Sequence, residues 1–291
     1  MLKAASESLF WYWINERHSI YLKRARGEPK PWTDDPILRD HKFTNVFRQL
    51  DRGTVWLTDH VIWPHRDDDP SLLLFNIAWY RMFNWTGTGA LLGWRRSWRP
   101  GQVARKLHRA RSAGHQVFTG AHIVYGGAAG QSKIDAVVGF AEQAWVRRRE
   151  LATVARESRR LETMFQALIQ IRGVGAFIGY EIVSDLRHTS LLADAADINT
   201  WANVGPGALR GLRRLDPMMR PAEGLARMRE LSARSRKSTA EWVPPMELRD
   251  VEHSLCEFDK YCRVKFGEGK TRSSYPGLPE KENADGSAGR S

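Results

Sequence analysis

Apolar residues recur every three or four positions along most of this chain, which is the spacing of a helix with one buried face. In residues 6–24 this stripe comprises Leu9, Phe10, Trp13, Ile14, Ile20 and Tyr21. The same spacing predicts helices over residues 43–63, 70–85, 99–114, 132–170, 220–238 and 244–266. Prolines separate the first two of these helices, because proline cannot continue a helix. Only residues 121–127 resemble a strand, so the pattern predicts an all-α protein.

The length and the ends of the pattern predict the domain organisation. A chain of 291 residues is long enough to bury a sizeable core. From about residue 277 the sequence is rich in glycine, serine and charge and has no apolar stripe. We therefore expect residues 1–276 to form a single helical domain, as one compact unit or as two closely packed lobes, and residues 277–291 to form a disordered tail.

Residues 158–186 combine two helical stripes with a glycine turn, which is typical of the helix-hairpin-helix motif that grips DNA backbone. The expected apolar faces are Leu161, Phe165, Leu168 and Ile169, followed by Phe177, Ile178, Ile182 and Leu186. Gly173 and Gly175 in the turn allow positive φ and let a phosphate oxygen approach backbone N–H groups. The alternative is an ordinary turn between two helices, which also favours glycine.

A second glycine turn, Gly205-Pro206-Gly207, opens a basic helix that carries Arg210, Arg213 and Arg214. The start of a helix after glycine favours anions, because its backbone N–H groups are unpaired. We therefore expect Gly205, Gly207 and Arg213 to contact DNA backbone, as we do Gly173 and Gly175.

Between the two turns lie residues that could hold a base outside the duplex. Asn199 could hydrogen-bond to such a base and Trp201 could stack on it. Asp194 and Asp197 are the nearest carboxylates, and a glycosylase would need one of them for catalysis. The alternative for Asp197 is an N-cap ahead of Thr200.

The charge balance favours a nucleic-acid partner or a phosphorylated substrate. The formal net charge is +12, and 34 of the 45 basic residues are arginine, which binds phosphate in a bidentate manner. The alternative is a merely basic, soluble surface. Two cysteines, Cys256 and Cys262, are too few for a cysteine-based zinc site or iron–sulfur cluster. No apolar run is long enough to span a membrane, so we expect a cytoplasmic protein with free thiols.

Both ends of the pattern carry candidate catalytic groups. Asn45, Arg48 and Arg52 would share one face of the helix predicted over residues 43–63. Near the C-terminus, Glu257, Lys260 and Tyr261 share a face, as do Asp259 and Arg263. A carboxylate beside a lysine at an apolar wall can act as a general base. The alternative is a set of exposed ion pairs.

Four motifs in this order resemble a known family. They are "FTNVFRQLDR", "FTGAHIV" with Lys133 beyond it, "INTWANVGPGALRGL", and "HSLCEFDKYCR" followed by "GEGKTR". Residues 40–275 are similar to the α-glutamyl/putrescinyl thymine pyrophosphorylases, mainly bacteriophage proteins also described as amino acid:DNA transferases. The resemblance implies a DNA-glycosylase-like helical fold. It also implies replacement of the phosphate or pyrophosphate on 5-hydroxymethyluracil in DNA by an amine.

The resemblance implies three partners: double-stranded DNA that carries phosphorylated 5-hydroxymethyluracil, an amino acid or polyamine, and a separate DNA-base kinase that acts upstream. Chemistry then suggests roles for the residues. Arg48, Arg52, Arg210 and Lys260 would neutralise the leaving phosphate. Glu257 or Asp259 would deprotonate the amine. Asn199, Trp201, Asn45 and Tyr261 would hold the base.

No metal or organic cofactor is needed for this reaction, and the sequence has no P-loop with which the chain could be its own kinase. If the chain is phage-encoded, it would act in the host cytoplasm. Two other functions stay open: a DNA glycosylase of the helix-hairpin-helix type with Asp197 as the catalytic group, and a non-enzymatic DNA-binding protein.

Overall fold

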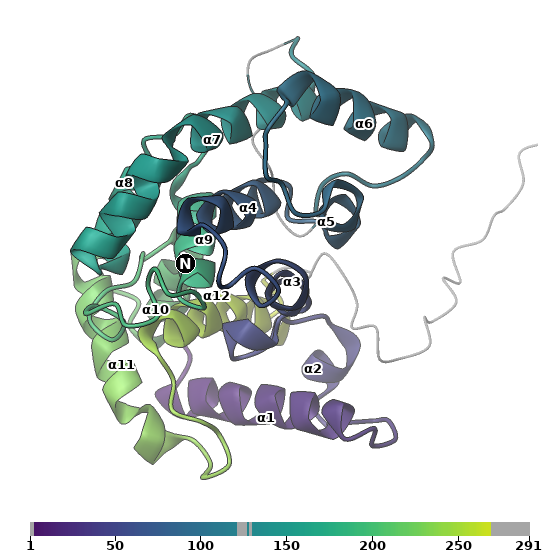
Figure 1. Ribbon diagram of the computed structural model, residues 1–291. Helices are drawn as coiled ribbons and strands as arrows, with labels where there is room; N and C mark the ends of the chain where they lie inside the picture. Colours follow the sequence, from purple (N-terminus) through teal and green to yellow (C-terminus); the bar gives the residue numbers. More distant parts are fainter. Residues whose placement is uncertain (1–2, 121–126, 128–129, 269–291) are drawn as a thin grey trace, which may run out of the picture. The chain divides into compact units, whose positions relative to one another are not determined.

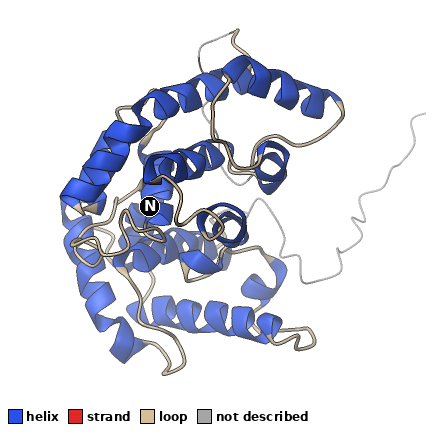
Figure 2. Cartoon of the chain, viewed as in Figure 1, coloured by secondary structure: helices blue, strands red, loops and turns tan. Residues whose placement is uncertain are grey.

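The computed structural model describes residues 3–120, 127 and 130–268. The tail expected over residues 277–291, and most of the strand-like segment 121–127, lie outside these described residues. Within the described ranges the regular structure is helical and no β-strand occurs (Figure 2), so the predicted all-α class is confirmed. No helix in this part of the chain is both long and apolar enough to cross a membrane.

The chain divides into two compact units. Unit 1 contains the N-terminal residues up to Phe47 together with residues 206–246 and the chain from Asp250 onward. Its helices (Figure 1) are α1 (Glu7–Ala25), α2 (Pro36–Asp40), α10 (Pro206–Leu215), the 3₁₀ turn η3 (Pro221–Glu223), α11 (Gly224–Ser238) and α12 (Leu248–Lys265). Unit 2 contains residues 48–205 and 247–249, including the first two residues of α12.

The core of unit 1 forms where α1 meets α12. Ser6 caps α1 by accepting a hydrogen bond from the Leu9 N–H, and the apolar stripe of α1 turns inward. Phe10 packs edge-on against Phe258 with ring centroids 5.2 Å apart, and both side chains are fully buried. Helix α10 packs on α12 through Gly207 and Gly211, where any β-carbon would clash with Cys256 and Leu255 respectively. These two glycines therefore serve close helix packing.

Unit 2 is built around α4 (Pro70–Phe83), which is buried along nearly its whole length and packs on α7 and α9. Asp69 caps α4, and Asn84 ends it in the left-handed region. The other helices of the unit are η1 (Arg48–Leu50), α3 (Arg52–Leu57), the π-helix η2 (Thr58–Ile62), α5 (Thr86–Leu92), α6 (Pro100–Ser112), α7 (Lys133–Ser158), α8 (Leu161–Leu168) and α9 (Ala176–Leu186).

The helix predicted over residues 43–63 is wrong in its first part. Residues 42–47 are irregular, and helical structure starts with the 3₁₀ turn η1 at Arg48. The physical reason is Arg17 of α1, whose guanidinium donates hydrogen bonds to the carbonyls of Phe43 and Thr44. A side chain thus satisfies backbone groups that a helix would otherwise pair internally. Asn45, Arg48 and Arg52 consequently do not share a helix face.

The long helix predicted over residues 132–170 is divided in two. Arg159 adopts a left-handed conformation (φ 47°) at the end of α7, and α8 begins at Leu161. The buried Asp197 carboxylate accepts hydrogen bonds from the N–H groups of Leu161 and Glu162, 2.7 and 3.0 Å away. A residue distant in sequence therefore caps α8, which local periodicity cannot predict.

Candidate functional site

In unit 1, two motifs more than 200 residues apart in sequence lie against each other. The Thr44 N–H donates to Glu257 Oε2 over 3.0 Å, and the Thr44 hydroxyl lies 2.8 Å from His253 Nε2. Lys260 donates to the same Glu257 oxygen over 3.1 Å. We call these four residues, Thr44, His253, Glu257 and Lys260, the Thr44–Glu257 cluster. The irregular segment after α2 and one face of α12 thus form a single polar site.

The cluster keeps partial access to solvent. The side chain of Glu257 is 13 % exposed and that of Lys260 is 21 % exposed. The Lys260 ammonium lies 4.8 Å from the centre of the Phe43 ring, a cation–π arrangement that holds it in place. A carboxylate at such a wall can accept a proton from a hydroxyl or amine, and the neighbouring ammonium can bind phosphate. The sequence-predicted pair Glu257 and Lys260 is therefore brought together.

Two predicted base-binding residues flank this cluster but are engaged within the protein. Asn45 accepts a hydrogen bond from Arg17 Nη2 over 2.6 Å. Tyr261 is buried, and its hydroxyl donates to Asp35 over 2.7 Å. Burial, together with the Asp35 carboxylate, raises the pKa of Tyr261 well above its usual value. These contacts anchor the segments on either side of Thr44, and base binding by Asn45 and Tyr261 stays a prediction.

Asp259 lies on α12 near Glu257 in sequence but has different surroundings. Its side chain is fully buried, and it pairs with Arg214 at 2.9 Å, Arg210 at 3.1 Å and Arg263 at 3.4 Å. Arg214 is itself fully buried and also pairs with Glu268 at 2.6 Å. Asp259 therefore joins α10 to α12, and the charge of Arg210 is partly balanced inside unit 1. The predicted catalytic role of Asp259 and the phosphate-binding role of Arg210 stay predictions.

The glycine turn before α10 also serves packing. Gly205 precedes the helix, and Gly207 faces Cys256 of α12. Arg213 donates to the Met219 carbonyl over 3.1 Å. Both cysteines are free thiols, and burial raises the pKa of Cys256 and of Cys262 to about 12, which keeps them protonated and unreactive. DNA-backbone contact by Gly205, Gly207 and Arg213 stays a prediction.

In unit 2, Arg48 is buried and forms an ion pair with Glu181 of α9. Arg81 of α4 lies 3.5 Å from the same carboxylate and binds Asp185 with two hydrogen bonds, one of them 2.8 Å long. Two arginines and two carboxylates thus form a buried ionic network between η1, α4 and α9. Arg52, the other predicted phosphate ligand of this segment, is exposed.

Three residues of unit 2 that are predicted to act on a nucleobase differ in their exposure to solvent. Asp197 is buried as the cap of α8, so its contacts are structural. Trp201 is buried against Phe165 and Tyr180, with ring centroids 5.3 and 5.8 Å apart. Asn199 is exposed. Of the three, Asn199 is the one whose side chain is accessible from solvent.

Residues 161–186 form two helices, α8 and α9, joined by a glycine turn, and their identity as a helix-hairpin-helix motif stays a prediction. Gly173 has φ +83°, as expected, but a β-carbon there would clash with the Phe140 ring of α7. Gly175 has an extended backbone and open space around its α-carbon. Phe177, expected to face inward, is 52 % exposed. Of the two glycines, Gly175 is therefore the one that leaves room for a ligand, and DNA binding by the turn stays a prediction.

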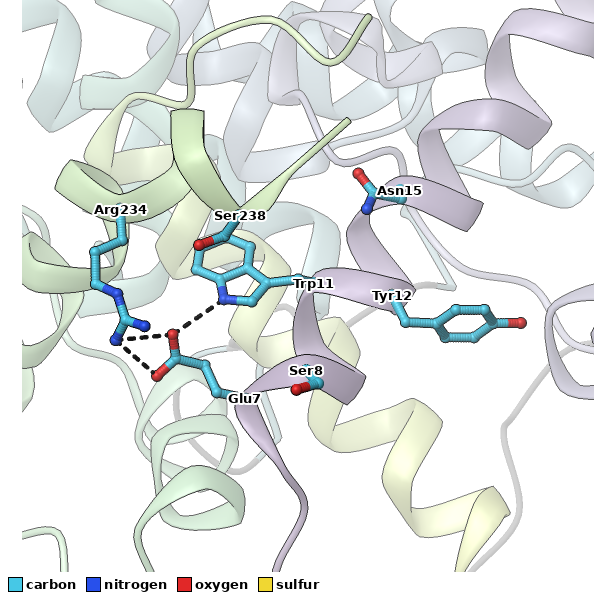
Figure 3. A pocket seen from close by; sticks show the side chains of 7 residues that line it. All are labelled: Glu7, Ser8, Trp11, Tyr12, Asn15, Arg234 and Ser238. Atoms are coloured by element: carbon cyan, nitrogen blue, oxygen red, sulfur yellow. Dashed lines mark hydrogen bonds and ion pairs between the residues drawn. The ribbon is translucent and has the colours of Figure 1, made fainter. Parts of the chain in front are cut away.

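A shallow hollow of about 540 Å³ lies on α1 and α11 in unit 1 (Figure 3). Glu7 lies in it, ion-paired with Arg227 and Arg234 at 2.8 and 3.0 Å and bonded to Trp11 Nε1. Burial alone would raise the pKa of Glu7, but these hydrogen bonds and charges lower it overall. None of the sequence-predicted site residues lines the hollow, and its carboxylate is already neutralised.

Sequence reasoning missed Thr44 and His253. Thr44 directly precedes Asn45 in the sequence. His253 lies four residues before Glu257, and this spacing places His253 and Glu257 on one face of α12. That spacing was a usable signal, whereas the contact with Thr44 depends on tertiary packing. Within the described ranges, no three His, Cys, Asp or Glu side chains gather closely enough to hold a metal ion.

Comparison with known proteins identifies the family. The family described as "5-hmdU DNA kinase, helical domain" matches residues 5–271. A 5-hmdU DNA kinase of Bacillus phage SP10 is 30 % identical over 225 residues, which are 69 % of this chain and 35 % of the phage protein. The chain thus spans about a third of that relative's length. No solved structure matches the chain. The match over nearly the whole chain shows that the protein belongs to the family of helical domains of 5-hmdU DNA kinases.

Proposed function

We propose that this chain is the DNA-binding, base-presenting helical part of a system that phosphorylates 5-hydroxymethyldeoxyuridine in DNA. The family match over residues 5–271 is the observation that carries the proposal. It supports the predicted link with phage modification of thymine in DNA, with a kinase indicated rather than the amine transferase. The positive charge of the chain and the exposed turn at Gly175 agree with binding of a DNA backbone.

The proposed chemistry is transfer of a phosphoryl group. The hydroxymethyl oxygen attacks the terminal phosphorus of a nucleoside triphosphate, and the bond between that phosphorus and the diphosphate breaks. The hydroxyl proton passes to a side chain that acts as a general base. Because the sequence has no G-x-x-x-x-G-K-[ST] run, we assign nucleotide binding to a region equivalent to the unmatched part of the phage relative. This chain would then supply DNA binding and groups that contact the hydroxymethyl arm.

Glu257 is the proton acceptor that we propose, and Lys260 is the proposed phosphate contact. Glu257 is a partly exposed carboxylate of α12, whereas Asp259 is fully buried among arginines. The Thr44 N–H and the Lys260 ammonium fix one Glu257 oxygen, which leaves the other oriented for proton transfer. Glu257→Gln keeps an oxygen that can accept the hydrogen bond from the Thr44 N–H. The substitution should therefore remove the proton acceptor with little change in fold.

The second candidate function is the amine transferase, favoured by the order of four motifs that resemble those of thymine pyrophosphorylases. It would use the same site, with Glu257 taking a proton from an amine and Lys260 stabilising the departing phosphate. Its partners would be phosphorylated 5-hydroxymethyluracil in duplex DNA, an amino acid or polyamine, and an upstream kinase.

Competition binding tests the primary proposal. Two duplexes of one sequence, one with 5-hydroxymethyldeoxyuridine and one with thymidine at a single position, compete for the full chain. A hydrogen bond to the extra hydroxyl is worth about 1 kcal/mol, so we expect roughly fivefold tighter binding of the modified duplex. Equal affinities would contradict the proposal.

Product analysis separates the two chemistries. Duplexes that carry 5-hydroxymethyldeoxyuridine are incubated with the chain, the unmatched part of the phage relative and a nucleoside triphosphate. Duplexes that carry its phosphate are incubated with the chain and a mixture of amines, and the nucleosides of both are analysed by mass spectrometry. A new phosphoryl group on the first duplex supports the kinase, and an amine in place of phosphate on the second supports the transferase. Glu257→Gln should abolish the product without loss of DNA binding. Glu241→Gln, an exposed change of equal charge, serves as the control.

A further inference from the structure

A long part of unit 2 contains no acidic residue. Between Pro70 and Lys133 the sequence has neither aspartate nor glutamate, although both occur throughout the rest of the chain. Basic residues occur repeatedly in the same stretch, and α6 lies within it. The cations of α6 and of the segment before it are Arg95, Arg96, Arg99, Arg105, Lys106, Arg109 and Arg111.

Helix α6 buries one narrow side and exposes the rest. Val103 and Leu107 are its buried residues, and the helix packs on α7 (Figure 1). Trp98 Nε1 donates to the Val138 carbonyl and His108 lies 3.0 Å from Asp135, so α6 runs antiparallel to the start of α7. The basic residues on the outer side of α6, and two in the segment before it, are all exposed: Arg96, Arg99, Arg105, Lys106, Arg109 and Arg111.

These six cations have no acidic partner among the described residues. The nearest carboxylate along α7, Asp135, is engaged by His108. Lys106 donates to the Leu91 carbonyl, which leaves its charge uncompensated. The contrast with α11 is clear, because Arg227 and Arg234 there both pair with Glu7.

At the end of α6, the positive charge of Arg111 acts on Lys133. Lys133, at the start of α7, lies over the Phe118 ring at 4.6 Å. Partial burial and, next, the positive charge of Arg111 lower the pKa of Lys133. An anion that binds beside Lys133 and Arg111 would relieve the repulsion on the Lys133 ammonium.

We propose that the outer face of α6 binds the phosphate backbone of duplex DNA. From Arg99 to Arg111 the helix rises about 18 Å, which matches roughly five base pairs of duplex. Arginines dominate the face and suit bidentate phosphate contacts. The inference rests on the proposed DNA-directed function and names the surface that holds the duplex, separate from the residues that contact the base.

The test is a triple variant with a matched control. Arg105→Gln, Arg109→Gln and Arg111→Gln together remove three charges from the α6 face. Arg24→Gln, Arg236→Gln and Lys237→Gln remove three exposed charges from unit 1. Fluorescence anisotropy of a labelled 5-hydroxymethyldeoxyuridine duplex gives Kd across a salt series. Each lost phosphate contact should lower the slope of log K against log salt by about 0.9. We expect the α6 variant to lose about 2–3 in slope and at least about tenfold in affinity.

Circular dichroism should show that both variants keep their helical content, so that lost affinity reports lost contacts. If the α6 variant and the control keep the same slope as the wild type, the face is merely solvated and the inference is wrong. Duplex RNA that competes as well as the DNA, with the same sensitivity to the α6 variant, would also overturn it. A wild-type chain that binds the duplex through α6 with no preference for the modified base would instead contradict the proposed function.

Discussion

Helices α6 and α10 carry the same sequence signals and use them in opposite ways. Each begins with Pro-Gly, at Pro100 in α6 and Pro206 in α10, and each carries several arginines within about three turns. In α10 the arginines reach carboxylates and carbonyls, and Gly207 packs on α12. In α6 the arginines face solvent and Gly101 is open.

The difference between them is the availability of carboxylates. Asp259 and Glu268 lie beside α10 and balance its charge, whereas the stretch around α6 contains no acidic residue. A glycine followed by arginines therefore predicts an anion site only where the protein does not supply its own anion. Arginine content alone does not distinguish α6 from α10 as the proposed DNA-binding surface, whereas the lack of acidic residues around α6 does.

The largest expected effect is on stability and comes from the α10 side. Asp259→Asn removes the buried carboxylate that pairs with Arg210, Arg214 and Arg263, and leaves the buried Arg214 with Glu268 as its acidic partner. Removal of one partner of a buried ion pair costs about 3–5 kcal/mol. The triple glutamine variant of α6 should change the free energy of unfolding by less than about 1 kcal/mol, because its side chains are exposed. Urea denaturation measures both. Equal losses would remove the distinction between the two helices.

The glycines give the next effect. In Gly211→Ala the new β-carbon meets the Leu255 carbonyl, so α10 must shift away from α12 at a cost of about 1–3 kcal/mol. Gly101→Ala on α6 meets only the flexible end of Arg105, at 3.6 Å, and should be neutral or stabilise by up to about 1 kcal/mol. Thermal unfolding of the two variants checks the opposite signs, and a destabilised Gly101→Ala would show that the start of α6 is not open.

Substitutions in α10 should weaken DNA binding less than substitutions in α6 do. Arg210→Gln removes a charge that already pairs with Asp259 in unit 1. We expect Kd for duplex DNA to rise by no more than about threefold, since a charge already paired contributes little to counterion release. The salt series used for α6 measures this. A loss as large as that of the α6 variant would mean that α10 also contacts the backbone, as the sequence first indicated.

The smallest effect is a pH dependence confined to the α10 side. Burial alone would raise the pKa of Glu268, but hydrogen bonds from the Lys3 N–H and Arg214 lower it below 4.5 overall. A carboxylate with a lowered pKa stabilises the fold above its unfolded pKa, and this contribution is lost as pH falls through the folded value. Unfolding free energy should therefore fall less steeply below pH 4.5 in Glu268→Gln than in the wild type. Identical acid slopes would contradict the assignment.

The sequence predicted the helical class and most helices because apolar periodicity is a local signal. It failed at residues 43–47, where the side chain of Arg17 replaces backbone pairing, and at Arg159, where Asp197 caps the next helix from a distance. It paired Glu257 with Lys260 from helical spacing, but it could not place Thr44 beside them, since that contact joins segments far apart in sequence. It also could not distinguish glycines with open space beside them, such as Gly175, from glycines that pack against another helix, such as Gly211.

In the proposed function, the chain presents a 5-hydroxymethyldeoxyuridine base from duplex DNA. The most direct measurement places 2-aminopurine opposite that base and follows its fluorescence as the full chain is added, because the probe brightens when its partner leaves the stack. We expect a marked increase with the modified duplex and a much smaller one when thymidine occupies the same position. A bound duplex whose fluorescence does not change with either base would contradict the account.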